Sequence, residues 1–213
     1  MSKNQEVATP VIRRLPRYYR FISNLLADGV ERISSKELSI KMGLTASQIR
    51  QDLNCFGGFG QQGYGYNLHT LQEKIGIILG IDKKIKTVLV GAGNIGRAVG
   101  SRMDFESAGF SIQAVFDNDE SVIGKTIRDV PVIDAKIMRE YCEKNSIKAA
   151  IVCVNDASAR KVVESLIESG VEIFWNFTHY DIQLSYPNKE LAIENVHLND
   201  SLMTLRYLAK ERI

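Results

Sequence analysis

The sequence of 213 residues contains few cysteines and no long hydrophobic run. Its three cysteines, Cys55, Cys142 and Cys153, form no C-x-x-C pair. This excludes a disulfide framework and an obvious zinc site, so no metal is expected, and it fits a reducing compartment. No apolar stretch approaches the ~20 residues of a membrane span. The first residues also lack the charged and then apolar layout of a signal peptide, and we therefore expect a cytoplasmic protein without a membrane partner.

Charge is nearly balanced overall but unevenly distributed. The net charge is +2, from 27 Lys and Arg against 25 Asp and Glu. Residues 1–80 hold ten Lys and Arg against six Asp and Glu, which leaves seventeen against nineteen for the rest. A basic front on a mildly acidic body is compatible with a nucleic-acid-binding domain joined to a different second domain. The length also suits two domains of ~100 residues each.

Residues 1–80 have the pattern of short helices followed by a glycine-rich hairpin. A first apolar helical pattern runs through residues 11–25, where Pro16 is expected to mark a helix start. Two capping boxes, at residues 34–37 and 45–48, open short helices on either side of a turn at Gly43, which predicts a helix-turn-helix. Residues 56–66 alternate aromatics with glycines and predict a small hairpin, or wing. The alternative is a small helical cap or dimerisation module.

The second helix of a helix-turn-helix enters the major groove of DNA. Its exposed polar residues should contact base edges and phosphates, and they are Ser47, Gln48, Arg50 and Gln51. An arginine binds guanine or a phosphate, and a glutamine suits adenine. In the wing, Gly63 and Tyr64 are expected to lie against the neighbouring minor groove or backbone.

Residues 81–197 alternate strands with helices, which predicts an α/β domain with a parallel sheet covered on both faces. Its most informative segment is Gly91-Ala92-Gly93-Asn94-Ile95-Gly96, a G-x-G-x-x-G motif that follows an apolar strand and opens a helix. In this context Gly91 permits a tight turn, Gly93 lets the backbone approach a pyrophosphate, and Gly96 lets helix and strand pack closely.

Asp117 ends the next predicted strand. A carboxylate at this place can accept hydrogen bonds from the ribose diol of a dinucleotide and would repel a 2′-phosphate. The sequence therefore predicts an NAD(H) site rather than an NADP(H) site. The alternative is a glycine-rich turn in an α/β domain that binds no ligand.

Several motifs lie in order along nearly the whole chain. They are residues 14–20 (RLPRYYR), 34–38 (SSKEL), 48–53 (QIRQDL), 59–66 (FGQQGYGY), 91–98 (GAGNIGRA), 176–177 (NF) and 194–196 (ENV). In combination they resemble the Rex family of redox-sensing transcriptional repressors. The resemblance implies a winged-helix domain at residues 1–80, a doubly wound parallel Rossmann domain at 81–197 and a C-terminal helix at 198–213.

The resemblance also implies a function. The protein would form a homodimer whose C-terminal helices are swapped between subunits, which fits the apolar stripe of Leu198, Leu202 and Leu205. It would repress transcription by binding a palindromic operator in double-stranded DNA when NADH is scarce, and NADH would release it. NAD(H) would then be a ligand rather than a redox substrate, and the protein would not be an enzyme.

The resemblance places Arg20, Arg102, His179 and His197 at the nicotinamide end of the ligand. Here the sequence departs from the family, which typically has tyrosine at position 102, Ala-Pro or Ser-Pro at 178–179 and aspartate at 197. That aspartate pairs with the arginine corresponding to Arg20, an ion pair that His197 cannot form. We therefore expect altered discrimination between nucleotides. His197 would add pH sensitivity if it titrates, the alternative being a buried neutral histidine.

Two other functions remain open. An NAD-dependent oxidoreductase with a helical N-terminal extension would use His179 as its acid–base group, although little room is left for a substrate-binding domain after residue 120. A regulator that holds NAD(H) constitutively would respond to another signal. Cys55, between the second helix and the wing, is either a thiol sensor or, as we expect, a small buried apolar residue.

Overall fold

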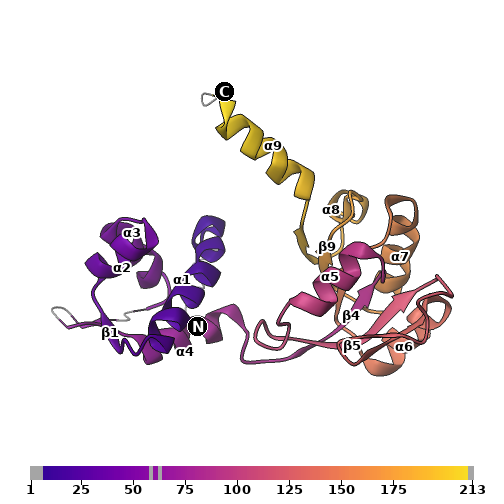
Figure 1. Ribbon diagram of the computed structural model, residues 1–213, viewed down its shortest axis with the longest axis horizontal. Helices are drawn as coiled ribbons and strands as arrows, with labels where there is room; N and C mark the ends of the chain where they lie inside the picture. Colours follow the sequence, from indigo (N-terminus) through magenta and orange to yellow (C-terminus); the bar gives the residue numbers. More distant parts are fainter. Residues whose placement is uncertain (1–6, 58–59, 62–63, 211–213) are drawn as a thin grey trace. The chain divides into compact units, whose positions relative to one another are not determined.

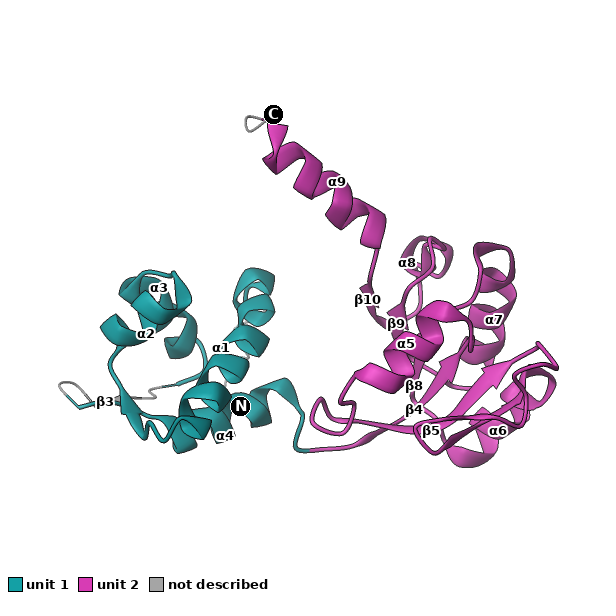
Figure 2. Cartoon of the chain, viewed as in Figure 1, with its two compact units in different colours: residues 1–82 teal, residues 83–213 magenta. Residues whose placement is uncertain are grey.

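The computed structural model describes residues 7–57, 60–61 and 64–210 of the chain. The chain divides into two compact units, Met1–Asp82 and Lys83–Ile213, so the division lies just beyond the boundary expected at residue 80 (Figure 2). The wing residue Gly63, predicted to contact DNA, lies outside the described residues. Among the helices of the described ranges, none is long and apolar enough to cross a membrane.

Unit 1 contains the helices labelled α1 to α4 in Figure 1 and a three-stranded antiparallel sheet in the order β1-β3-β2. Its elements are α1 (Thr9–Ala27), β1 (Arg32–Ile33), α2 (Ser35–Met42), α3 (Ala46–Asn54), β2 (Gly60–Gln61), β3 (Gly65–Asn67) and α4 (Leu68–Leu79). The hairpin of β2 and β3 follows α3 directly. The predicted succession of helix, turn, helix and wing is therefore confirmed.

Local hydrogen bonds fix the turn between α2 and α3. The Glu37 N–H donates to Ser34 Oγ at 3.1 Å and the Ser34 N–H donates to Glu37 Oε2 at 2.9 Å, which completes the capping box. Gly43 ends α2 with φ of +63°, a left-handed conformation that glycine adopts without a steric penalty. The Gln48 N–H donates to Thr45 Oγ1 at 3.1 Å and starts α3. Local hydrogen bonds alone therefore define where α2 begins and ends and where α3 begins.

The α1 helix runs without interruption through Pro16, so the prediction that Pro16 marks a helix start is wrong. Pro10 stands in the first turn instead, where a missing N–H costs nothing. Pro16 removes one backbone donor from the helix interior. The helix continues nevertheless, because Leu15, Tyr18 and Ile22 on both sides of the proline are buried in the core of unit 1.

Unit 2 contains a seven-stranded sheet in the order β10-β9-β8-β4-β5-β7-β6, in which only β6 and β7 pair antiparallel. The strands are β4 (Ile85–Val90), β5 (Phe110–Asp117), β6 (Thr126–Ile127), β7 (Val130–Asp134), β8 (Ala149–Val152), β9 (Ile173–Asn176) and β10 (Ala192–Asn195). From β4 the chain moves to one side of the sheet and then returns to β8 on the other. This is the doubly wound Rossmann order, in which ligands bind outside the carboxyl ends of the strands at the point of reversal.

Helices pack on both faces of the sheet. The helices α6 (Met138–Asn145) and α7 (Asp156–Glu168) contribute to one buried cluster, and α5 (Asn94–Arg102) lies against the opposite one. The short elements η1 (Ala135–Ile137) and α8 (Ile182–Ser185) complete the connections. The last helix, α9 (Leu198–Leu208), follows β10 and has no buried residue.

Candidate functional site

Two glycines of the loop after β4 are required by close packing. Gly91 has φ of +99°, and a Cβ added there would lie 2.6 Å from the backbone oxygen of Cys153. A Cβ added at Gly96 would lie 1.8 Å from the Gly91 oxygen, because α5 begins directly against the end of β4. The structure therefore places Gly91 and Gly96 in the roles predicted from their spacing.

Gly93 differs from its neighbours because nothing in the described chain crowds it. A Cβ added there would have no atom within 4 Å. Gly93 is the N-cap of α5, and no side chain among the described residues caps this helix, so its first N–H groups, at Asn94 and Ile95, have no capping acceptor there. Bare backbone at an uncapped helix N-terminus is the geometry that binds a phosphate. The loop therefore fits the pyrophosphate of a dinucleotide.

Asp117 lies at the carboxyl end of β5, beside this loop. Its Oδ2 accepts the Ala92 N–H at 2.5 Å, and its Oδ1 accepts the Asp119 N–H at 2.9 Å. Each oxygen of an ionised carboxylate has a further lone pair, so Asp117 can still accept hydrogen bonds from two ribose hydroxyls. The structure thus brings Asp117 together with the glycine loop, and it shows that Asp117 also holds the loop.

Asn176 organises the carboxyl ends of β9 and β10. It is fully buried, and its Nδ2 donates to Asn195 Oδ1 at 2.8 Å and to the Tyr180 oxygen at 3.0 Å. Its Oδ1 accepts the N–H of Thr178 at 3.1 Å and the hydroxyl of Thr178 at 2.8 Å. This residue fixes the loop that carries His179, a role that no local pattern in the sequence indicates.

The histidines His179 and His197 lie together at this edge of the sheet. Their rings are stacked, with centroids 5.7 Å apart and 19° between the planes. Nδ1 of His179 is 3.1 Å from Asp156 Oδ2, and the His179 N–H donates to Asp156 Oδ1 at 2.9 Å. Nδ1 of His197 is 3.3 Å from Asp200 Oδ2. The backbone N–H and then the ring of His179 lower the pKa of Asp156.

The two arginines predicted for the nicotinamide end lie on helices, Arg102 on α5 and Arg20 on α1. Arg102 is exposed and ends α5, about 12 Å along the helix axis from Asn94 at 1.5 Å per residue. Arg20 is an exposed residue of α1 in unit 1. The role of both at the nicotinamide end stays a prediction.

The cysteines have distinct environments. Cys55 ends α3 and is exposed, so the expectation of burial is wrong; its Sγ donates to the Gln51 oxygen at 3.3 Å. Burial raises the pKa of Cys142 to about 11 and that of Cys153 to about 12. Throughout the described ranges, no group of three His, Cys, Asp or Glu residues could hold a metal ion.

The helix α3 presents one polar face to solvent. Ser47, Arg50 and Gln51 are exposed as predicted, and exposed Asn54 follows them at the spacing i, i+3, i+4, i+7 of one helix face. Helical spacing alone could have added Asn54 to the predicted set. The Arg50 Nη1 donates to Ser35 Oγ at 3.1 Å. In the wing, Tyr64 is 71% exposed.

Gln48 belongs to a buried network instead of this face. It is half-buried and its Nε2 donates to Asp52 Oδ1 at 2.8 Å. Asp52 is 1% exposed and also accepts hydrogen bonds from Arg14 Nε at 2.6 Å, Arg14 Nη2 at 2.8 Å and the Tyr18 hydroxyl at 2.8 Å. One carboxylate of α3 is therefore anchored to α1 by two residues.

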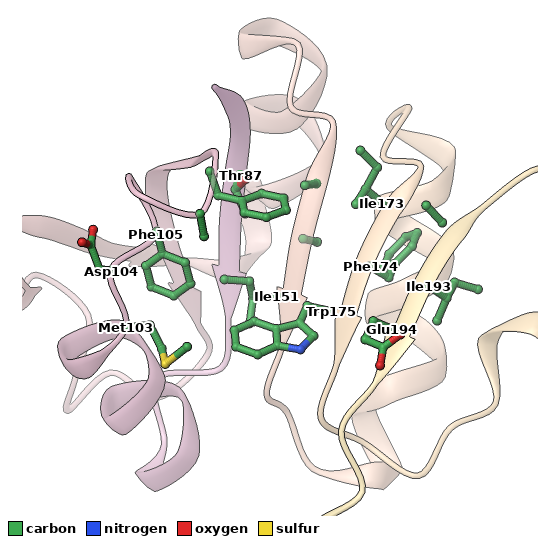
Figure 3. A pocket seen from close by; sticks show the side chains of 15 residues that line it. Thr87, Met103, Asp104, Phe105, Ile151, Ile173, Phe174, Trp175, Ile193 and Glu194 are labelled. Carbon is green, nitrogen blue, oxygen red and sulfur yellow. The ribbon is translucent and has the colours of Figure 1, made fainter. Parts of the chain in front are cut away.

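An apolar groove opens on the sheet of unit 2 (Figure 3). Its volume is about 460 Å³, and side chains of β4, β8, β9 and β10 line it, among them Ile151, Ile173 and Trp175. Met103 and Phe105, which follow α5, close one side. Asp104 and Glu194 are the charged residues among those that line the groove.

Both parts of the chain match known protein families. Residues 6–54 match the family model described as "Putative DNA-binding protein N-terminus", and residues 82–180 match the one described as "CoA binding domain". The chain is 46% identical to the redox-sensing transcriptional repressor Rex of Clostridium perfringens over 208 residues, which make up 98% of this chain and 97% of that protein.

Two solved structures match across both units. A crystal structure of RSP in complex with β-NAD⁺ and operator DNA has a TM-score of 0.89 and 45% identity, and covers 97% of this chain and 94% of that one. A crystal structure of RSP in complex with β-NADH has a TM-score of 0.86 and 42% identity, with 98% and 97% covered.

Proposed function

The chain belongs to the Rex family of redox-sensing transcriptional repressors, and from this we propose that it represses transcription in the cytoplasm according to the NADH/NAD⁺ ratio. It binds a palindromic operator when NADH is low and leaves the DNA when NADH binds. One observation carries the proposal: bare Gly93 stands at the uncapped N-terminus of α5 with Asp117 beside it. NAD(H) is a ligand of this site and is not consumed.

Different residues of the site bind different parts of the ligand. The backbone from Gly91 to Gly96 holds the pyrophosphate, with Ala92, Asn94 and Ile95 between the glycines, and Asp117 holds the adenosine ribose. Arg20, Arg102, His179 and His197 are assigned to the nicotinamide end. NADH shifts the protein away from DNA only through a higher affinity for the state that does not fit the operator. NAD⁺ competes for the same site while favouring that state less.

Unit 1 supplies the DNA contacts. The exposed face of α3 enters the major groove with Ser47, Arg50 and Gln51, and Tyr64 of the wing lies beside it. Gln48 stabilises α3 through its hydrogen bond to the buried carboxylate of Asp52. Arg50 contributes the positive charge of the face, which suits both guanine and phosphate.

The proposed partner of the chain is a second copy of itself. The helix α9 exposes Leu198, Leu202 and Leu205 by 63%, 65% and 60%, and the groove on the sheet of unit 2 is apolar. A large exposed apolar surface on a globular domain marks an interface. A homodimer that exchanges α9 buries these leucines and gives the two-fold symmetry that a palindromic operator requires.

Fluorescence anisotropy of a labelled inverted-repeat duplex from the protein's own promoter tests the function. At fixed salt, the full chain is titrated onto the duplex, and NADH is added without and then with excess NAD⁺. We expect tight binding, release by NADH, and opposition of that release by NAD⁺. Tight binding indifferent to both nucleotides would support a regulator with another signal. Turnover of a carbonyl or alcohol without duplex binding would support an oxidoreductase.

A further inference from the structure

The pair of stacked histidines lies where the second half of the dinucleotide must go. Asp117 on β5 takes the adenosine ribose on one side of β4, so the ligand continues from the α5 N-terminus toward the other side. There the carboxyl ends of β8 and β9 come next in the sheet. The loop after β9 carries His179, and the residue that starts α9 after β10 is His197.

In each ring, the neighbouring carboxylate determines which nitrogen carries a proton. An ionised carboxylate only accepts hydrogen bonds, so the Nδ1 atoms that face Asp156 and Asp200 carry protons. Nε2 is then the atom whose protonation makes each imidazole a cation. Nε2 of His197 is buried and has no hydrogen-bond partner among the residues that the structure describes. It is therefore available to a polar group of a bound ligand.

The charge of the pair depends on the carboxylates that face the rings and on the distance between the two rings. The carboxylates that face the rings are Asp156 from α7, with Oδ2 3.1 Å from Nδ1 of His179, and Asp200 from α9, with Oδ2 3.3 Å from Nδ1 of His197. Two imidazolium cations with centroids 5.7 Å apart would repel each other. Asp181, next in the loop, is turned to α8, where it accepts the Leu184 N–H at 2.9 Å. Histidine is the side chain whose ordinary titration falls between pH 5 and 8.

We propose that His179 and His197 form a proton-dependent discriminator that favours NADH over NAD⁺ as the pH falls. This inference rests on the proposed function of the NAD(H) site. The nicotinamide ring is cationic in NAD⁺ and neutral in NADH. A proton on the histidine pair repels the cationic ring and leaves the neutral ring unaffected. The protein then reports acidity together with the redox ratio, and NADH releases it from DNA more readily in acid.

Isothermal titration calorimetry of the full chain with NAD⁺ and with NADH, at pH 6, 7 and 8 and constant salt, tests this. The ratio of the NAD⁺ Kd to the NADH Kd should rise about tenfold from pH 8 to pH 6, the effect of one charge on another some 6 Å away in a partly solvated site. By linkage, NAD⁺ binding should release protons from the histidine pair and NADH binding should not, which titrations in buffers of different ionisation enthalpy measure.

Variants separate the pair from general pH effects. His179→Asn and His197→Asn should each reduce the pH dependence of the ratio, and the double variant should abolish it. The matched control is His69→Asn, which removes the chain's third histidine, an exposed residue of α4 in unit 1, and should keep the dependence. If both nucleotides bind the wild type and the ratio of the NAD⁺ Kd to the NADH Kd is constant with pH, this inference is overturned but the proposed function is not. Absence of binding at every pH would overturn the proposed function with it.

Discussion

Gln48 and Asp52, one turn apart on the recognition helix α3, are joined by a hydrogen bond of 2.8 Å from Gln48 Nε2 to Asp52 Oδ1. The same carboxylate receives Arg14 and Tyr18 from α1. Gln48 is therefore committed to holding the helix in place, although its residue type suggests contact with adenine. The surface that we propose for DNA contact is the exposed face of Ser47, Arg50, Gln51 and Asn54.

Arg50→Ala should weaken operator binding by about 1–3 kcal/mol and reduce the salt slope by about one, because the guanidinium that we propose to contact DNA is lost. Gln48→Ala should leave the salt slope unchanged, since its amide faces Asp52. Anisotropy titrations over a salt series with cognate and scrambled duplexes measure both. Equal loss of binding in the two variants would show that Gln48 turns to the DNA after all.

Asp52→Asn should destabilise unit 1 by about 3 kcal/mol, because it leaves the guanidinium of Arg14 without its buried counter-charge. The figure is at the low end for buried pairs, since the Arg14 side chain is 28% exposed. Hydrogen exchange of the α1 and α3 amides is the suitable measurement, because the single tryptophan, Trp175, lies in unit 2. Gln51→Ala on the exposed face is the control and should leave this exchange unchanged.

The same carboxylate predicts how unit 1 responds to acid. Burial by itself raises the pKa of Asp52, but hydrogen bonds from Arg14, Tyr18 and Gln48 outweigh it and hold the pKa below the usual value of 3.8. A depressed pKa stabilises the folded state above the unfolded pKa, and this stabilisation is lost as the pH falls through the folded pKa. Unfolding of unit 1 by urea between pH 6 and pH 3 should show stability falling below about pH 4 in wild type and less in Asp52→Asn.

The packing at Gly96 in the nucleotide loop could be predicted from the sequence because this glycine acts on a near neighbour in the chain. Gly96 is crowded by Gly91, five residues before it, so the spacing of the motif already contains the contact. Asp52 could not be predicted in the same way. Its partners Arg14 and Tyr18 are 38 and 34 residues away, and no local pattern links them.

Two other predictions from the sequence, for Pro16 and Cys55, were wrong because of where the buried residues lie. Pro16 was expected to begin a helix because of its missing N–H, yet the buried face around it carries α1 straight through. Cys55 was expected in the core because cysteine behaves as a small apolar residue. It is exposed because it stands at the C-cap of α3, beyond the last buried residue of that helix, Leu53.

Gly96→Ala should destabilise unit 2, whereas Gly93→Ala should leave its stability almost unchanged. A methyl group at Gly93 meets no atom within 4 Å, so the stability of unit 2 should change by less than about 0.5 kcal/mol. It occupies the space that we propose for the pyrophosphate, and NADH affinity should fall about tenfold or more. Gly96→Ala puts a methyl group against the Gly91 oxygen and should cost about 3 kcal/mol of stability. Thermal unfolding followed by Trp175 fluorescence and NADH titration distinguish the two; tight NADH binding by Gly93→Ala would contradict the site.

The cysteines should react in a fixed order with iodoacetamide at pH 8. Cys55 is exposed and should be labelled first, whereas Cys153 and Cys142, whose pKa values burial raises to about 12 and about 11, should stay almost unlabelled in the folded protein. Peptide mass spectrometry gives the order, and labelling in urea provides the control. Rapid labelling of Cys153 would show that the loop packed against Gly91 opens readily.

Leu202→Asp should convert the dimer to a monomer and abolish high-affinity operator binding. A buried leucine contributes about 1.5–3 kcal/mol, and two-fold symmetry counts each substitution twice, so dimerisation should weaken by about 3–6 kcal/mol. The control is Thr204→Lys, which places a charge on the opposite side of α9 at 100° per residue and should leave the dimer intact. Sedimentation equilibrium measures the dimer Kd, and anisotropy measures the operator. A Leu202→Asp variant that remains a dimer would place the interface elsewhere than on the leucine stripe, and α9 would then need another role.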